Sequence, residues 1–122
     1  MKWILVILAI PAFFAGCKKD SGEPPVISIT TPADHQTFQG GQIVTINATI
    51  IDHDEVHHVH LYVRNKGTSG EILHVEEHPD TKTFSLSKTF TAQAGITYQI
   101  EIQADNHAGN TADVKIEVTG VN

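Results

Sequence analysis

Eight of the 122 residues are histidine, and all eight lie between His35 and His107. Four of them and one glutamate occupy alternate positions in, or directly after, two apolar segments at residues 56–64 and 71–77. Side chains of a β-strand point alternately to opposite faces, so the aliphatic residues of each segment define a core face and the polar residues the opposite one. The polar set is His58, His60, His74, His78 and Glu76.

The two segments are joined by a short loop and must pair antiparallel, and only two registers keep their aliphatic faces together. In the first register His60 faces His74, and in the second it faces Glu76. The residue opposite His58 changes as well: it is Glu76 in the first register and His78 in the second. Both registers gather the five residues on one outward patch, with same-face neighbours about 6.6 Å apart along a strand and opposed Cβ atoms about 5 Å apart.

This patch has the chemistry of a divalent transition-metal site. Imidazole nitrogens can converge from such spacings on an ion about 2.0–2.1 Å from each of them. Three or four imidazoles with one carboxylate favour Zn or Cu(II) over Mg or Ca. We therefore predict that the five residues bind Zn or Cu(II), with Glu76 as a fifth ligand or as a partner of the ligating histidines.

Histidine also fills outward strand positions as an ordinary polar residue. The patch is alternatively a solvated face, or the contact surface of a non-catalytic adhesion or accessory module for a protein or glycan, with no physiological metal. Clustered histidines that charge together on acidification would instead make a pH-sensing face. His57 alternates in step with the core positions of its segment, so we predict a partly buried structural histidine there. His35 is predicted to be an ordinary loop residue.

The chain from Val26 onward alternates with period two and carries turn residues between its apolar runs, which predicts an all-β fold. Seven strands separated by turns about every ten residues indicate a seven-stranded antiparallel sandwich of two sheets. The predicted strands are 26–30, 42–51, 56–64 and 71–77, followed by runs patterned by Phe84 to Phe90, Tyr98 to Ala104 and Ala112 to Val118.

Three segments resemble bacterial immunoglobulin-like (Ig-like) domains: Pro25-Val26-Ile27-Ser28-Ile29, the turn Gln39-Gly40-Gly41, and the run from Tyr98 to Asn110, which contains Ala104-Asp105-Asn106-His107-Ala108-Gly109-Asn110. The resemblance covers most of residues 25–121. It implies an immunoglobulin-like β-sandwich over residues 26–122, with Tyr98 as the corner tyrosine whose hydroxyl bonds to backbone.

A second polar cluster is predicted in two loops that share one end of such a sandwich, residues 52–55 and 105–107. Their oxygen-rich side chains could hold calcium, which takes carboxylates and carbonyls. Ordinary turn chemistry is the alternative, since Asp and Asn bond their own backbone in turns. The two clusters could also form one site, with His53 approaching His78. The candidate residues of the loops are Asp52, His53, Asp54, Asp105 and His107.

Composition argues against several other classes. The formal net charge is −6 and no basic patch is present, which argues against a nucleic-acid partner. Cys17 is the single cysteine, so an intramolecular disulfide and thiolate metal sites are excluded. A flat sheet face offers no substrate pocket, and we do not expect an enzyme.

The N-terminal residues have the layout of a secretory signal, with Lys2 before an apolar run and small residues before Cys17. The run is shorter than the roughly 20 residues of a membrane-spanning helix. Phe14-Ala15-Gly16-Cys17 resembles the lipobox of bacterial lipoproteins. This resemblance implies a signal peptide at residues 1–16, a lipidated Cys17 carrying acyl chains such as palmitate, and a spacer to residue 25. It places the protein in the cell envelope, anchored to a membrane, with the outer membrane favoured because Lys18 follows the cysteine.

More loosely, the lipobox, a single Ig-like domain and a His-rich central hairpin resemble putative lipoproteins of the DUF4625 type. The members compared have histidines in a longer loop after the third strand. This chain has only residues 65–70 at that point.

Because imidazole must be neutral to bind a metal ion, we predict that affinity for Zn or Cu(II) falls as the pH decreases through about 6.5, the ordinary histidine value. Calorimetric titration at neutral pH and at about pH 5.5 measures this. Binding of equal strength at both pH values would show that imidazoles are not the ligands.

Overall fold

The computed structural model describes residues 22–122, all of which lie in strands, turns and connecting segments. The predicted signal peptide, the lipidated Cys17 and the start of the spacer lie outside the described residues. The strands are β1 (Val26–Thr31), β2 (Gln36–Gln39), β3 (Ile43–Asn65), β4 (Glu71–Glu77), β5 (Thr81–Thr91), β6 (Thr97–Asn106) and β7 (Thr111–Val121). The predicted all-β, Ig-like sandwich is confirmed.

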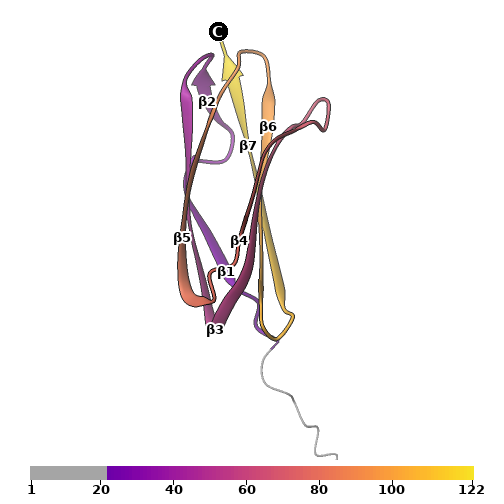
Figure 1. Ribbon diagram of the computed structural model, residues 1–122. Helices are drawn as coiled ribbons and strands as arrows, with labels where there is room; N and C mark the ends of the chain where they lie inside the picture. The colour runs from indigo at the N-terminus through magenta and orange to yellow at the C-terminus, as the bar shows by residue number, and fades with distance from the viewer. Residues whose placement is uncertain (1–21) are drawn as a thin grey trace, which may run out of the picture.

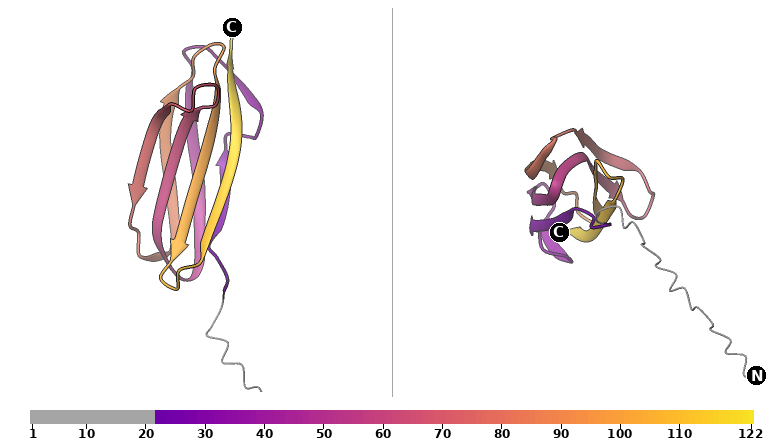
Figure 2. Two further views of the ribbon diagram at one scale, coloured as in Figure 1. Left: turned by 90° about the vertical axis from the view of Figure 1, so that its right-hand side faces the viewer. Right: turned by 90° about the horizontal axis from the view of Figure 1, so that it is seen from below.

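The long strand β3 belongs to both layers of the sandwich, because it bends at one end of the molecule (Figure 1). Residues 43–51 pair antiparallel with β1 and β5. Residues 56–65 pair antiparallel with β4 and β6. The second layer continues from β6 to β7, and Figure 2 shows β4, β3, β6 and β7 side by side.

Two features differ from the sequence prediction. Residues 42–51 and 56–64 were predicted as separate strands with a loop between them, but β3 continues through residues 52–55. Val56 pairs with both Thr81 of β5 and Asn106 of β6, so it stands where the strand passes between layers. The short β2 was not predicted, since only Phe38 of its four residues is buried, and it pairs parallel with β7.

Alternating side chains of β3 fill the core from both layers. Ile46 and Ile50 from the first half and Leu61 and Val63 from the second are fully buried. Ile102 of β6 is buried beside them. Each such side chain contributes about 1.5–3 kcal/mol by leaving water. The same alternation sends His58, His60 and Tyr62 to the outer face, as predicted.

Tyr98 forms the corner predicted from the sequence. Its side chain is buried, with its ring 4.9 Å from that of Phe90. Its hydroxyl oxygen accepts a hydrogen bond of 2.8 Å from the backbone N–H of Gln93, five residues upstream. This bond fastens the β5–β6 connection to the core.

We predict that Tyr98→Phe lowers the free energy of unfolding by about 1–3 kcal/mol, because the Gln93 N–H loses its partner in a partly buried place. Urea denaturation measures the change. The control is Tyr62→Phe, which keeps the stacking of that ring on His74 at the outer face and should change stability much less. Equal losses in the two variants would contradict the assigned role of the corner.

Candidate metal centre

Three connections lie together at one end of the sandwich, the lower end in Figure 1. They are the bend of β3, the β4–β5 connection at residues 78–80, and the β6–β7 turn at residues 107–110. A buried hydrogen bond ties two of them, since Asn106 Nδ2 donates to Asp52 Oδ2 at 3.0 Å. Asn106 Oδ1 also accepts from the N–H of Asn110, which closes the turn after β6. The backbone that carries the neighbouring histidines is therefore held in place.

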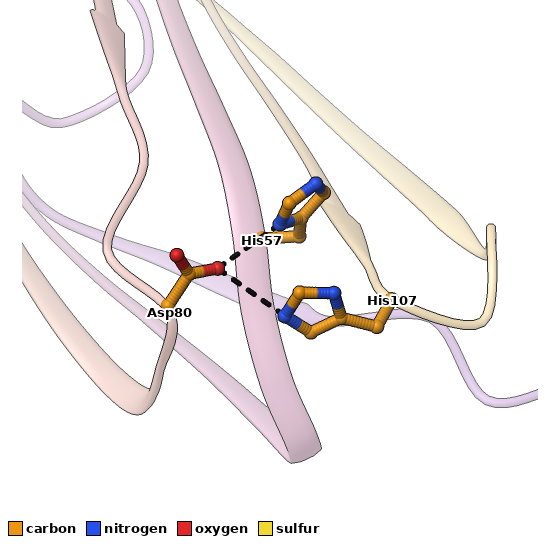
Figure 3. Close-up of side chains that lie close together, drawn as sticks. All are labelled: His57, Asp80 and His107. Atoms are coloured by element: carbon orange, nitrogen blue, oxygen red, sulfur yellow. Dashed lines mark hydrogen bonds and ion pairs between the residues drawn. The ribbon is translucent and has the colours of Figure 1, made fainter.

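His57, Asp80 and His107 meet at this end, one from each connection or its border (Figure 3). Asp80 Oδ1 lies 3.0 Å from His57 Nδ1 and 3.2 Å from His107 Nε2. The three ligand atoms all lie within 4.8 Å of one another. Within residues 22–122, these three residues are the His, Cys, Asp or Glu side chains that gather at this spacing in a group of three or more.

A β-bulge directs His57 toward this group. Val56 pairs with Asn106 and His58 pairs with Asp105, so His57 is an extra residue on β3 that faces no residue of β6. Its side chain is 35% exposed. The prediction of partial burial is confirmed, but the assignment of His57 to a purely structural role missed its contact with Asp80, because strand parity takes no account of a bulge.

The spacing fits a small tetrahedral ion. Ligand atoms about 2.0–2.1 Å from such an ion lie roughly 3.3 Å from one another, close to the distances from Asp80 Oδ1 to the two imidazoles. Glu55 Oε2 lies 3.3 Å from His107 Nε2, but Glu55 does not belong to the group whose ligand atoms all lie within 4.8 Å of one another. The group therefore supplies two nitrogen ligands and one carboxylate, all from partly exposed side chains.

Asp80 is suited to ligation by its charge. The hydrogen bond with His57, supported by the charges of His57 and His107, lowers the pKa of the Asp80 carboxyl below its ordinary value. The carboxylate is therefore ionised well below neutral pH, as a metal ligand must be.

The five residues predicted from the hairpin share the outer face of β3 and β4, in the second of the two predicted registers. His60 pairs with Glu76, and Tyr62 pairs with His74. The ligand atoms approach pairwise: His78 Nε2 lies 3.3 Å and His60 Nε2 4.0 Å from Glu76 Oε1. No three of the five have ligand atoms that all lie within 4.8 Å, within the described part of the chain.

His58 is occupied by a different partner. Its Nδ1 lies 3.0 Å from Asp105 Oδ1, which also accepts a hydrogen bond from the His58 backbone N–H. Its ring lies 3.9 Å from that of His57 and 4.6 Å from that of His78, measured between centroids. The hairpin patch and the loop cluster thus adjoin through His57 and His58. His53, which was predicted to approach His78, contacts Glu23 at 3.0 Å.

The residues considered for calcium do not gather around one point. Asp52 accepts hydrogen bonds from Asn106 and from the backbone N–H of Asp54. Asp105 bonds to His58, and His107 lies beside Glu55 and Asp80. Gly109 has a φ of 84°, the left-handed conformation of a turn glycine. These contacts support the alternative of turn chemistry for Asp52 and Asp54.

Asp80 was missed as a candidate ligand by the sequence analysis, whereas Glu55 lies in the predicted loop at residues 52–55 that was considered for calcium. Asp80 follows β4 directly, and β4 runs antiparallel to the second half of β3. The end of β4 must therefore lie near the start of that half, beside His57. This topological signal, in the sequence Glu77-His78-Pro79-Asp80, could have identified Asp80.

A carboxyl pair lies further along the same outer face. Burial tends to raise the pKa of Glu101, but the hydrogen bond from Arg64, at 2.8 Å, and the other polar neighbours outweigh it, so its pKa is lowered. Loss of hydration, together with the hydrogen bond and charge of Glu101, raises the pKa of Asp113. A shallow depression between this pair and the histidines is lined by His58, His60, Gln103, Asp105, Thr111 and Asp113, among others.

Comparison with known proteins identifies the family. The family model of the bacterial Ig domain matches residues 25–118, and the chain therefore belongs to this family. No curated protein matches the chain in sequence. Within residues 22–122 no helix has the length and apolar character needed to cross a membrane.

Two solved structures illustrate the fold. The superoxide reductase (neelaredoxin) of Ignicoccus hospitalis is similar with a TM-score of 0.57 and 11% identity, covering 80% of this chain and 80% of that one. The fibronectin(III)-like modules of Clostridium thermocellum CbhA are similar with a TM-score of 0.54 and 20% identity, covering 79% of this chain and 96% of that one. At these identities the likeness concerns the fold alone.

We predict that Asp113→Asn raises the free energy of unfolding at neutral pH. The raised pKa of Asp113 means that folding penalises its charged form, and the substituted amide removes that charge beside Glu101. Below the ordinary carboxyl range Asp113 is neutral in both folded and unfolded states, so the gain should shrink toward zero as the pH falls. Urea denaturation at several pH values measures it, and a gain that grows on acidification would contradict the assigned sign.

Proposed function

We propose that this protein is a lipid-anchored Ig-like domain of the bacterial cell envelope that binds Zn or Cu(II), for metal capture or buffering. The observation that carries the proposal is the convergence of His57, Asp80 and His107, with Asp80 Oδ1 at the ligand-to-ligand spacing of a tetrahedral ion from both imidazoles. The carboxylate of Glu55 lies beside this set, 3.3 Å from His107 Nε2.

The ligand types select the class of metal. Two imidazoles with carboxylates suit Zn or Cu(II), whereas Ca takes six to eight oxygen ligands. The exposure of Asp80 and His107 leaves the ion accessible from solvent. An accessible ion can be exchanged with a partner, which suits capture or buffering.

The anchor predicted at Cys17 would lie on the side of the metal site. Asn106 Nδ2, which holds the turn before His107, also donates to the backbone carbonyl of Glu23. The stretch from Cys17 to Glu23 spans at most about 20 Å when extended. A lipidated Cys17 would therefore keep the site close to the membrane surface.

A non-catalytic interaction module without a metal is the second candidate. Every histidine of the two clusters already lies within 4.0 Å of a carboxylate, as in the pairs His58–Asp105 and His74–Glu71. Such pairing neutralises the imidazoles when they are protonated and suits a face that contacts a protein or glycan. Likeness in fold to the fibronectin(III)-like modules fits an accessory domain.

Substituting His57 and His107 separates the two candidates. In His57→Ala/His107→Ala we expect the affinity for Zn and Cu(II) at this site to fall by at least about tenfold, since two nitrogen ligands are lost. Isothermal titration calorimetry of the full chain at neutral pH measures the affinity. Asp80→Asn should weaken binding as well, because the neutral amide is a poorer ligand than the carboxylate.

The matched control is His53→Ala, which removes an exposed histidine paired with Glu23 at the same end of the sandwich. It should bind metal like the unchanged chain. If the His57→Ala/His107→Ala variant binds as many ions as the control, and binds each as tightly, the proposed site is wrong. If the unchanged chain binds neither metal, the interaction module becomes the better account.

A further inference from the structure

Six histidines form one row on the outer face of the second layer and the adjoining β6–β7 turn. The ring centroids of His107 and His57 lie 4.2 Å apart, and the next two steps, to His58 and His78, measure 3.9 and 4.6 Å. Glu76 then links His78 to His60, and His60 Nδ1 lies 3.5 Å from His74 Nε2. The site proposed above uses only the first end of this row.

At the other end of the row, the carboxylate of Glu76 lies between two imidazoles. Glu76 Oε1 lies 3.3 Å from His78 Nε2, which is the ligand-to-ligand spacing of a tetrahedral ion. The same oxygen lies 4.0 Å from His60 Nε2. The side chains of Glu76 and His78 are 48% and 54% exposed, so both have room to turn toward a shared ion.

A series of polar neighbours favours His60 as a ligand. His74 Nδ1 lies 3.7 Å from Glu71 Oε1, beyond hydrogen-bond distance, and the negative charge of Glu71 favours the tautomer of His74 that carries its proton on Nδ1. His60 Nδ1–H can then donate to His74 Nε2, which leaves the lone pair of His60 on Nε2, the atom that faces Glu76. Such partners orient ligating imidazoles in metal sites.

Aromatic stacking holds the same rings in place. The ring of Tyr62 stacks on that of His74 with centroids 4.5 Å apart, and Arg64 covers Tyr62 at 4.3 Å. The ring of His60 lies parallel to that of Tyr62 at 5.9 Å. The side chain of His60 is 27% exposed, so it has little freedom to turn away from Glu76.

We propose that His60, Glu76 and His78 form a second site for Zn or Cu(II), with His74 as a positioning residue, so that one chain binds two ions. This inference rests on the proposed function for the class of metal, but it uses none of the same ligands. His58 separates the two sites, because Asp105 engages its Nδ1.

The number of ions bound per chain tests the inference. The full chain is titrated with Zn by calorimetry, and bound Zn is counted by elemental analysis after removal of excess metal. We expect two ions for the unchanged chain, one for His60→Gln/His78→Gln, one for His57→Gln/His107→Gln, and two for the control His53→Gln. Far-UV circular dichroism checks that each variant keeps the β-fold.

The outcomes distinguish the second site from the first. One ion in both the unchanged chain and His60→Gln/His78→Gln would overturn the second site and leave the proposed function standing. One ion that is lost in His60→Gln/His78→Gln and kept in His57→Gln/His107→Gln would overturn the first site and support the second.

The role of His74 has a separate readout. His74→Phe keeps an aromatic ring against Tyr62 but removes the nitrogen that orients His60. We expect the affinity of the second site to fall by about tenfold, while electron paramagnetic resonance of bound Cu(II) still shows two nitrogen ligands there. A loss of one nitrogen from the spectrum would make His74 a ligand and overturn its positioning role.

Discussion

The buried hydrogen bond between Asn106 and Asp52 holds together the end of the sandwich on which the candidate metal centre depends. It joins the bend of β3 to the end of β6, two segments that are far apart in sequence. Both side chains are buried, so loss of either partner would leave an unsatisfied polar group in a dry place. With these backbones held, the bulge at His57 and the turn at His107 direct two imidazoles toward the same carboxylate.

The outer face of β3 and β4 follows from a different constraint, the alternation of side chains along a strand. Aliphatic residues such as Leu61 fill the core, and the intervening positions carry the histidines to solvent. The acidic residues beside them, Glu76 and Asp105 among them, supply the negative charge that either a metal ion or a protonated imidazole requires. One surface thus suits both metal binding and a pH-dependent contact, and titration with metal separates the two.

The fold was largely predictable from the sequence, because strand periodicity and the corner at Tyr98 are local signals. The shared face of the hairpin histidines was predictable for the same reason, and one of the two registers allowed by the aliphatic pattern is observed. The group at His57 was not predicted, since the bulge breaks the parity on which the prediction depended. Asp80 was overlooked because its place beside His57 comes from topology and from no motif.

The most direct test of the account is a crystal of the protein grown or soaked with Zn and measured at the zinc absorption edge. We expect an anomalous difference peak about 2.0–2.1 Å from His57 Nδ1, His107 Nε2 and a carboxylate oxygen of Asp80. A well-ordered crystal that shows no peak between these three side chains, at a zinc concentration that saturates binding in solution, would contradict the central claim.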